Sequence, residues 1–96
     1  MRFAFHGLDR PGAADLRATH RDAHRHYQEG RSNPLGGPLL GPDGLPCGTL
    51  IVLEAADLDE AARIMAADPY VVAGLFEHVS LLPFEAVDWP TTPPRV

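Results

Sequence analysis

Three stretches of the chain have the hydrophobic pattern of β-strands. Arg2–His6 is short, with two phenylalanines on one side, and a turn at Leu8–Gly12 follows it. Cys47–Glu54 holds the continuous apolar run Leu50–Leu53, which predicts a strand covered on both faces. Phe76–Phe84 predicts a last strand, whose alternation assigns two sets of side chains to opposite faces. One set is Phe76, His78, Ser80, Leu82 and Phe84, and the other is Val79 and Leu81.

Two stretches have a helical pattern. Residues 13–29 contain no glycine or proline, and Gly30 supplies a stop signal. The second helix is predicted to begin at Asp57, a capping residue, with Glu60 three residues later to complete a capping box. Pro69 is predicted to end it, because a proline disfavours helical geometry at the residue before it. A short turn or helix then leads into the last strand.

One further strand completes a recognisable order. Leu35–Leu40 contains two glycines and a proline, which suit an edge strand, and it forms a hairpin with the strand after it. The resulting order is βαββαβ, the plan of ferredoxin-like α+β folds, with four antiparallel strands and both helices on one face. The apolar run at Leu50–Leu53 indicates that the other face is also covered. A second copy of the chain is the economical cover, so we expect a homodimer.

Domain limits follow from composition. Residues 1–88 are expected to form one domain, because 96 residues suffice for a single modest core. Residues 89–96 form a proline-rich tail, predicted to be disordered or to lie across a neighbour.

Charge and cysteine content exclude several classes. A net charge of −5 and a pI near 5.3 argue against a nucleic-acid-binding protein, which usually has a basic footprint. A single cysteine, Cys47, cannot form an intramolecular disulfide and fits a reducing compartment. The first residues do not resemble a signal peptide, and no apolar run approaches the length of about 20 residues that spans a membrane. We expect a cytoplasmic protein without membrane contact.

Several short motifs together resemble the YCII-related (YciI-like) family of small proteins. The most specific is Ala67-Asp68-Pro69-Tyr70 leading into Gly74–Val79. The others are Leu16-Arg17, Arg21-Asp22-Ala23-His24, Gly37-Pro38-Leu39 and Cys47-Gly48-Thr49. The resemblance covers nearly the whole chain. It implies a ferredoxin-like dimeric α+β barrel with an active site built from a histidine and an aspartate, which correspond to His24 and Asp68. The activity it suggests is hydrolase- or lyase-like action on a small molecule.

His24 and Asp68 are the catalytic candidates, and each also has an ordinary structural interpretation. A carboxylate beside an imidazole fixes the tautomer of the ring and prepares it for general acid–base work near neutral pH. Asp68-Pro69 is equally typical of a helix start, with the aspartate as cap and the proline first in the helix. His24 taken alone is typical of a surface histidine on a polar helix. Capping and histidine binding are compatible, since a carboxylate has two oxygens.

Other residues are candidates for substrate contact. Arg17 lies two helical turns before His24 and can bind an anionic group, although a solvated helix face is the alternative. Thr49 and Tyr70 can donate hydrogen bonds to a ligand, while Tyr70 is also typical of a packing residue. Cys47 is interpreted as a buried, small apolar residue rather than a nucleophile.

No cofactor or metal is expected. His20 and His24 have a spacing that can hold a metal, but no glutamate or cysteine accompanies them in a zinc motif. Phosphate-binding loops and nucleophile elbows are missing from the sequence. The hypothesis is therefore a small acid–base enzyme that uses His24 and Asp68. The alternative is a non-catalytic ligand-binding or interaction module of the same fold.

Overall fold

The elements follow the predicted order in a computed structural model, which describes residues 1–31 and 33–90. They are β1 (Arg2–Asp9), α1 (Ala14–Gln28), β2 (Leu35–Leu40), β3 (Pro46–Glu54), α2 (Leu58–Ala66), α3 (Pro69–Val72) and β4 (Phe76–Phe84). The first strand is longer than predicted, because it continues through Gly7 and Leu8 to Asp9. This extension places Asp9 at the end of a strand instead of in a turn.

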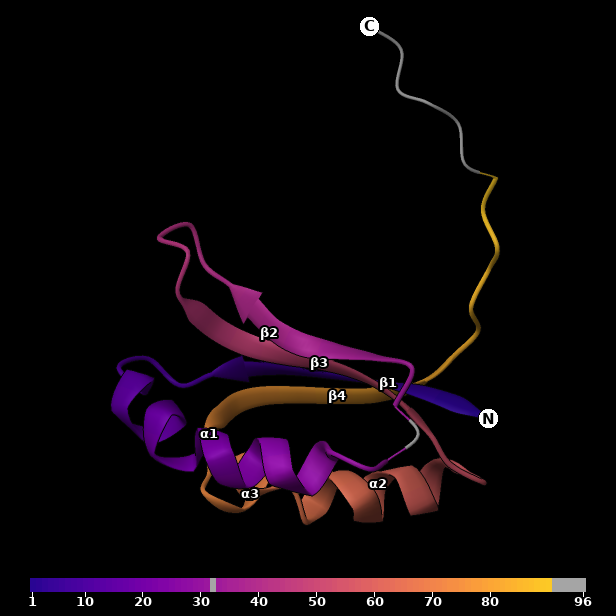
Figure 1. Ribbon diagram of the computed structural model, residues 1–96, viewed down its shortest axis with the longest axis horizontal. Coiled ribbons are helices and arrows are strands. Elements are labelled where there is room, and N and C mark those ends of the chain that lie inside the picture. Colours follow the sequence, from indigo (N-terminus) through magenta and orange to yellow (C-terminus); the bar gives the residue numbers. More distant parts are fainter. Residues whose placement is uncertain (32, 91–96) are drawn as a thin grey trace, which may run out of the picture.

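The four strands form one antiparallel sheet in the order β2-β3-β1-β4. All three helices lie on the same side of this sheet, as Figure 1 shows. The architecture is the predicted ferredoxin-like α+β fold. Leu35–Leu40 is an edge strand, as its glycines and proline indicated.

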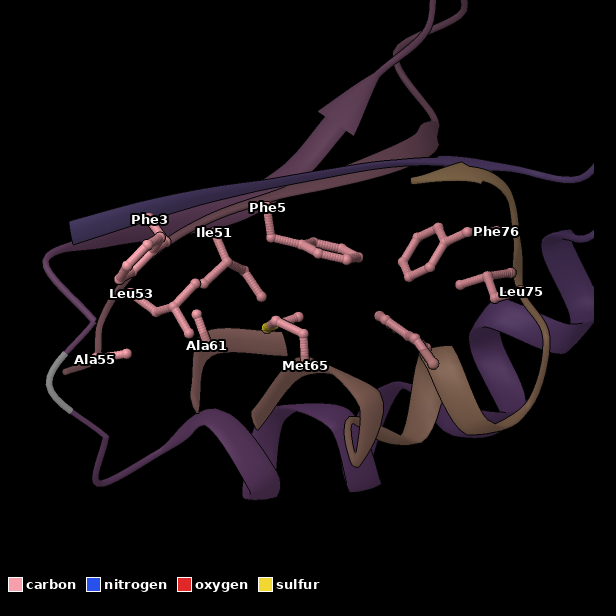
Figure 2. Packing of buried hydrophobic residues seen from close by; sticks show 10 residues of the cluster. Phe3, Phe5, Ile51, Leu53, Ala55, Ala61, Met65, Leu75 and Phe76 are labelled. Carbon is pink, nitrogen blue, oxygen red and sulfur yellow. The ribbon is translucent and has the colours of Figure 1, made fainter. Parts of the chain in front are cut away.

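The core fills the space between the sheet and the helices (Figure 2). Its strand members alternate along β1 and β3, so that their side chains point toward the helices. The cluster consists of Phe3, Phe5, Ile51, Leu53, Ala55, Ala61, Met65, Tyr70, Leu75 and Phe76. Tyr70 belongs to this cluster and to the candidate site, so the site is attached to the core.

Phe76 is on the opposite face from the one its alternation predicted. The register of β1 and β4 shifts between Leu8 and Asp9, and this β-bulge turns Phe76 toward the helices. Its ring packs edge-on against Phe5, with centroids 5.6 Å apart, and against Tyr70 at 6.1 Å. Gly7 makes room for it, since a Cβ there would lie 2.7 Å from the Phe76 ring.

Helix α2 begins at its predicted cap. The Asp57 carboxylate accepts a hydrogen bond from the backbone N–H of Glu60 at 2.8 Å. The Glu60 carboxylate reaches back to the N–H of Ala56, at 3.4 Å, rather than to that of Asp57. The backward bond of the capping box is therefore displaced by one residue.

The sheet face away from the helices carries exposed apolar side chains. Leu82 lies opposite Ala4 in the register, and Leu35 lies opposite Val52. Leu82 is 64% exposed and Leu35 is 60% exposed. This face has no cover within the described part of the single chain (Figure 1).

Two sequence predictions concern the ends and the membrane. Residues 91–96 of the predicted proline-rich tail lie outside the described residues, and Trp89, its first residue, is exposed. Within residues 1–31 and 33–90, none of the helices has the length and apolar character needed to cross a bilayer.

Candidate active site

Asp68 stands at the corner between α2 and α3. Its backbone is extended, and its Oδ1 accepts a hydrogen bond from the N–H of Tyr70 at 2.8 Å. Pro69 occupies the first helical turn, where its missing N–H costs nothing. The structural interpretation of Asp68 as a helix cap is therefore correct.

The same carboxylate also contacts His24, 44 residues earlier in the chain. The Nδ1 of His24 lies 2.7 Å from Oδ2 of Asp68 and 3.0 Å from Oδ1. Asp68 is fully buried, whereas the His24 side chain is 14% exposed. Asp68 thus caps α3 and binds His24 simultaneously.

Gln28 is a third partner of Asp68, which the sequence did not identify. Its side-chain N–H donates to Oδ2 of Asp68 at 2.7 Å, and its carbonyl accepts from the Asn33 amide at 2.7 Å. Gln28 lies one helical turn after His24, so the spacing i, i+4 is the signal that places both on one face of α1. Three donors satisfy the buried carboxylate in its ionised form.

This arrangement fixes the tautomer of His24. An ionised carboxylate only accepts hydrogen bonds, so Nδ1 must carry the proton that it shares with Asp68. Among the described residues, Nε2 has no hydrogen-bond partner, and no buried side-chain nitrogen or oxygen is left unsatisfied. Nε2 therefore has access to solvent, with its lone pair free to accept a proton.

Aromatic packing fixes the plane of the His24 ring. The rings of His24 and Tyr70 are stacked, with centroids 4.0 Å apart and planes 17° from parallel. The guanidinium carbon of Arg17 lies 4.8 Å from the Tyr70 centroid. Tyr70 itself is buried in the core, so it forms a rigid support for both side chains.

Arg17 is buried, in contrast to the solvated helix face that was the alternative. It is 4% exposed and forms a two-point ion pair with Asp9, at 2.7 Å and 2.9 Å. Its Nη2 also donates to the hydroxyl of buried Thr49 at 2.8 Å. The hydrogen bonds with Asp9 raise the pKa of the guanidinium against the opposing effect of burial, so Arg17 stays charged.

A cleft of about 620 Å³ joins these groups. Its lining includes His24 and all three proposed substrate contacts, whereas Asp68 lies behind His24. The lining residues are Arg17, Arg21, His24, Arg25, Gln28, Glu29, Asn33, Gly36, Gly37, Pro38, Pro46, Thr49, Ile51 and Tyr70. One wall is α1, and the other is formed by the glycine-rich edge strand and β3.

The structure gives less support to a role for Cys47, to a metal site or to the second cavity. Cys47 is exposed, so its interpretation as a buried apolar residue is wrong. No group of three or more His, Cys, Asp or Glu side chains in the described residues is arranged to hold a metal. A second cavity of about 510 Å³, near Met1 and Glu54, does not include His24 or Tyr70.

Comparison with known proteins places this geometry in context. The model of the YCII-related domain matches residues 1–85. Protein YciI of Escherichia coli O6:H1 is 31% identical over 98 residues, which cover 91% of this chain and 99% of that protein. Protein YciI of Shigella flexneri matches to the same extent.

A solved structure is also similar. The 5-chloro-2-hydroxyhydroquinone dehydrochlorinase (TftG) from Burkholderia phenoliruptrix AC1100, in complex with 2,5-dihydroxybenzoquinone, superposes with a TM-score of 0.83 and 30% identity. The match covers 88% of this chain and 94% of that one. The family model spans most of the chain and the relatives match along nearly their whole length, so this protein belongs to the YCII-related, YciI-like family.

Proposed function

We propose that this protein is a small-molecule enzyme in which His24 transfers a proton in a hydrolase- or lyase-like reaction. The observation that carries the proposal is the buried Asp68 carboxylate bound to Nδ1 of His24, with Nε2 free at the cleft. A histidine held in one tautomer by a carboxylate is the usual form of a general base or acid.

The roles follow from the contacts. Nε2 of His24 accepts a proton from the substrate or from a water molecule, and Asp68 stabilises the imidazolium that results. Gln28 holds Oδ2 of Asp68 in place. Arg17, Thr49 and Tyr70 are the proposed substrate contacts, because all three line the cleft beside His24.

Arg17 retains a donor for this purpose. Its Nε and Nη2 bond to Asp9 and Thr49, whereas Nη1 has no hydrogen-bond partner in the part of the chain that the structure describes. The Arg17 side chain lines the cleft, and Asp9 together with the nearby Tyr70 hydroxyl raises the pKa of the guanidinium, so we assign Nη1 to the substrate. The Asp9 pair holds the guanidinium rigidly, so this donor is preorganised for an oxygen of the substrate.

The activity of the structural neighbour favours elimination. That protein is a dehydrochlorinase, and its structure holds 2,5-dihydroxybenzoquinone. Loss of hydrogen chloride requires a base that removes a proton while chloride departs, and a free histidine nitrogen can provide it. A planar, oxygen-substituted ring is therefore our first choice of substrate shape.

A non-catalytic ligand-binding or interaction module remains the alternative function. The same cleft and the same hydrogen bonds serve it, because Asp68 also holds α1 against the corner between α2 and α3. The two functions differ in whether His24 changes protonation during a turnover.

We further propose that the protein is a cytoplasmic homodimer. The exposed apolar face of the sheet, with Leu35 and Leu82, supports it, because a second copy of the same face would remove these side chains from water. A single free cysteine fits the reducing compartment.

His24→Gln is expected to lower turnover by about 10²- to 10⁴-fold, the usual contribution of a general acid or base. The assay is chloride release from a panel of chlorinated hydroquinones, with the free energy of unfolding measured in urea. His20→Gln is the control, since His20 is on the same helix but does not line the cleft. Equal turnover in wild type and His24→Gln would contradict the catalytic role. Ligand binding without turnover in the wild type would favour the binding module.

Gln28→Leu is expected to lower the free energy of unfolding by about 1–3 kcal/mol, because it removes one of three donors from a buried carboxylate. Urea denaturation provides the measurement. His26→Leu on the exposed side of α1 serves as the control and should stay within about 0.5 kcal/mol of wild type. A Gln28→Leu protein as stable as this control would mean that Gln28 does not support Asp68.

Leu82→Glu is expected to convert the dimer to a folded monomer, because it places a charge on the exposed apolar face of the sheet. Analytical ultracentrifugation gives the mass, and circular dichroism checks the fold. Leu58→Glu, an exposed position at the start of α2, is the matched control and should remain dimeric. A monomeric wild type at all concentrations would refute the homodimer.

A further inference from the structure

The cleft beside His24 has an unusual charge for this protein. The chain as a whole carries a net charge of −5, yet three arginines line the cleft, at positions 17, 21 and 25, against one glutamate, Glu29. Asp9 neutralises Arg17 from behind. Arg21 and Arg25 have no hydrogen bond or ion pair to a carboxylate within residues 1–31 and 33–90.

The helix explains why these two arginines flank the histidine. Arg21 lies one turn after Arg17, and Arg25 lies one turn after Arg21, so all three share the face of α1 that holds His24. The opposite wall contributes glycines, prolines, Thr49 and Ile51, none of which carries a charge. The positive charge of the cleft is therefore concentrated on one wall, around the free Nε2 of His24.

We propose that this site selects planar ring molecules that carry a negative charge, such as aromatic carboxylates or ring enolates, and that Arg21 and Arg25 provide the selectivity. The His24 and Tyr70 rings, stacked on each other, both line the cleft and place an aromatic edge beside the arginines. The arginines attract the anionic group, which also reaches the free Nη1 of Arg17. This inference rests on the proposed function and adds the charge of the substrate to it.

The positive charge of Arg21 and Arg25 also favours proton transfer to His24. When His24 removes a proton from a neutral or anionic ring, negative charge builds up on the ring oxygens. Guanidinium groups beside the ring stabilise that charge as it forms. Arg21 and Arg25 thus serve both to attract the substrate and to stabilise its deprotonated form.

The test compares benzoate with benzamide, a neutral ring of nearly the same shape. Binding to the wild-type protein is followed by NMR titration of the backbone and ring signals of α1. Benzoate is expected to bind about tenfold more tightly than benzamide, and added salt is expected to weaken benzoate alone. Arg21→Gln and Arg25→Gln should each weaken benzoate about three- to tenfold and leave benzamide unchanged. Arg63→Gln, an exposed arginine on α2, removes the same charge elsewhere and should change neither.

Failure of the charge selectivity and failure of the site itself are distinguishable. Benzamide that binds as well as benzoate, with shifts at His24, would refute the charge selectivity and leave the proposed site intact. Shifts of the benzoate complex confined to residues away from His24 and Tyr70 would refute the site itself, and with it the proposed function. Benzoate affinity that is unchanged in both Arg21→Gln and Arg25→Gln, or no binding of either ring, would also overturn the selectivity.

Discussion

The buried carboxylate of Asp68 is the constraint on which the helical side of the molecule depends. A fully buried charge costs several kcal/mol unless hydrogen bonds replace the lost water. Here His24 and Gln28 from α1 and the backbone N–H of Tyr70 from α3 replace it. Because these donors come from two helices, satisfying the charge also joins the helices. The hydrogen bonds that hold this corner together therefore also orient the ring of His24.

Tyr70 connects this corner to the rest of the fold. Its ring packs against Phe76, and Phe76 packs against Phe5 in the centre of the sheet. The other partner of Tyr70 is the His24 ring, stacked at 4.0 Å. The plane of the imidazole is thereby fixed by the hydrophobic core, and its tautomer is fixed by Asp68. Such rigidity suits a catalytic group, because a preorganised group needs no rearrangement during the reaction.

Much of the fold could be predicted from local patterns, since alternation, helical spacing and capping residues are properties of neighbouring positions. Asp57 and Asp68 both cap helices as their sequence context indicated. Phe76 could not be placed correctly, because the bulge that turns it arises from pairing with β1. Asp9 was expected in a turn, so its ion pair with Arg17, which buries that arginine, was not foreseen.

The candidate site required information beyond local pattern. His24 and Asp68 are 44 residues apart, and only the family resemblance suggested that they belong together. Gln28 carries no chemical motif, and its role depends on the orientation of one carboxylate. In the sequence, Arg21 and Arg25 are typical of the solvated face of a basic helix. Only the fold shows that the glycine-containing edge strand forms the opposite wall of a cleft beside them.

The hydrogen bonds of Asp68 imply that His24 carries its proton on Nδ1 and that Nε2 is free at the cleft. Heteronuclear NMR of the ring nitrogens measures this directly in the neutral imidazole. We expect the Nδ1–H tautomer in the wild type, and a shift toward the Nε2–H tautomer in Asp68→Asn, whose amide can turn an N–H toward Nδ1. A wild-type His24 that carries its proton on Nε2, or a tautomer that does not respond to Asp68→Asn, would contradict it.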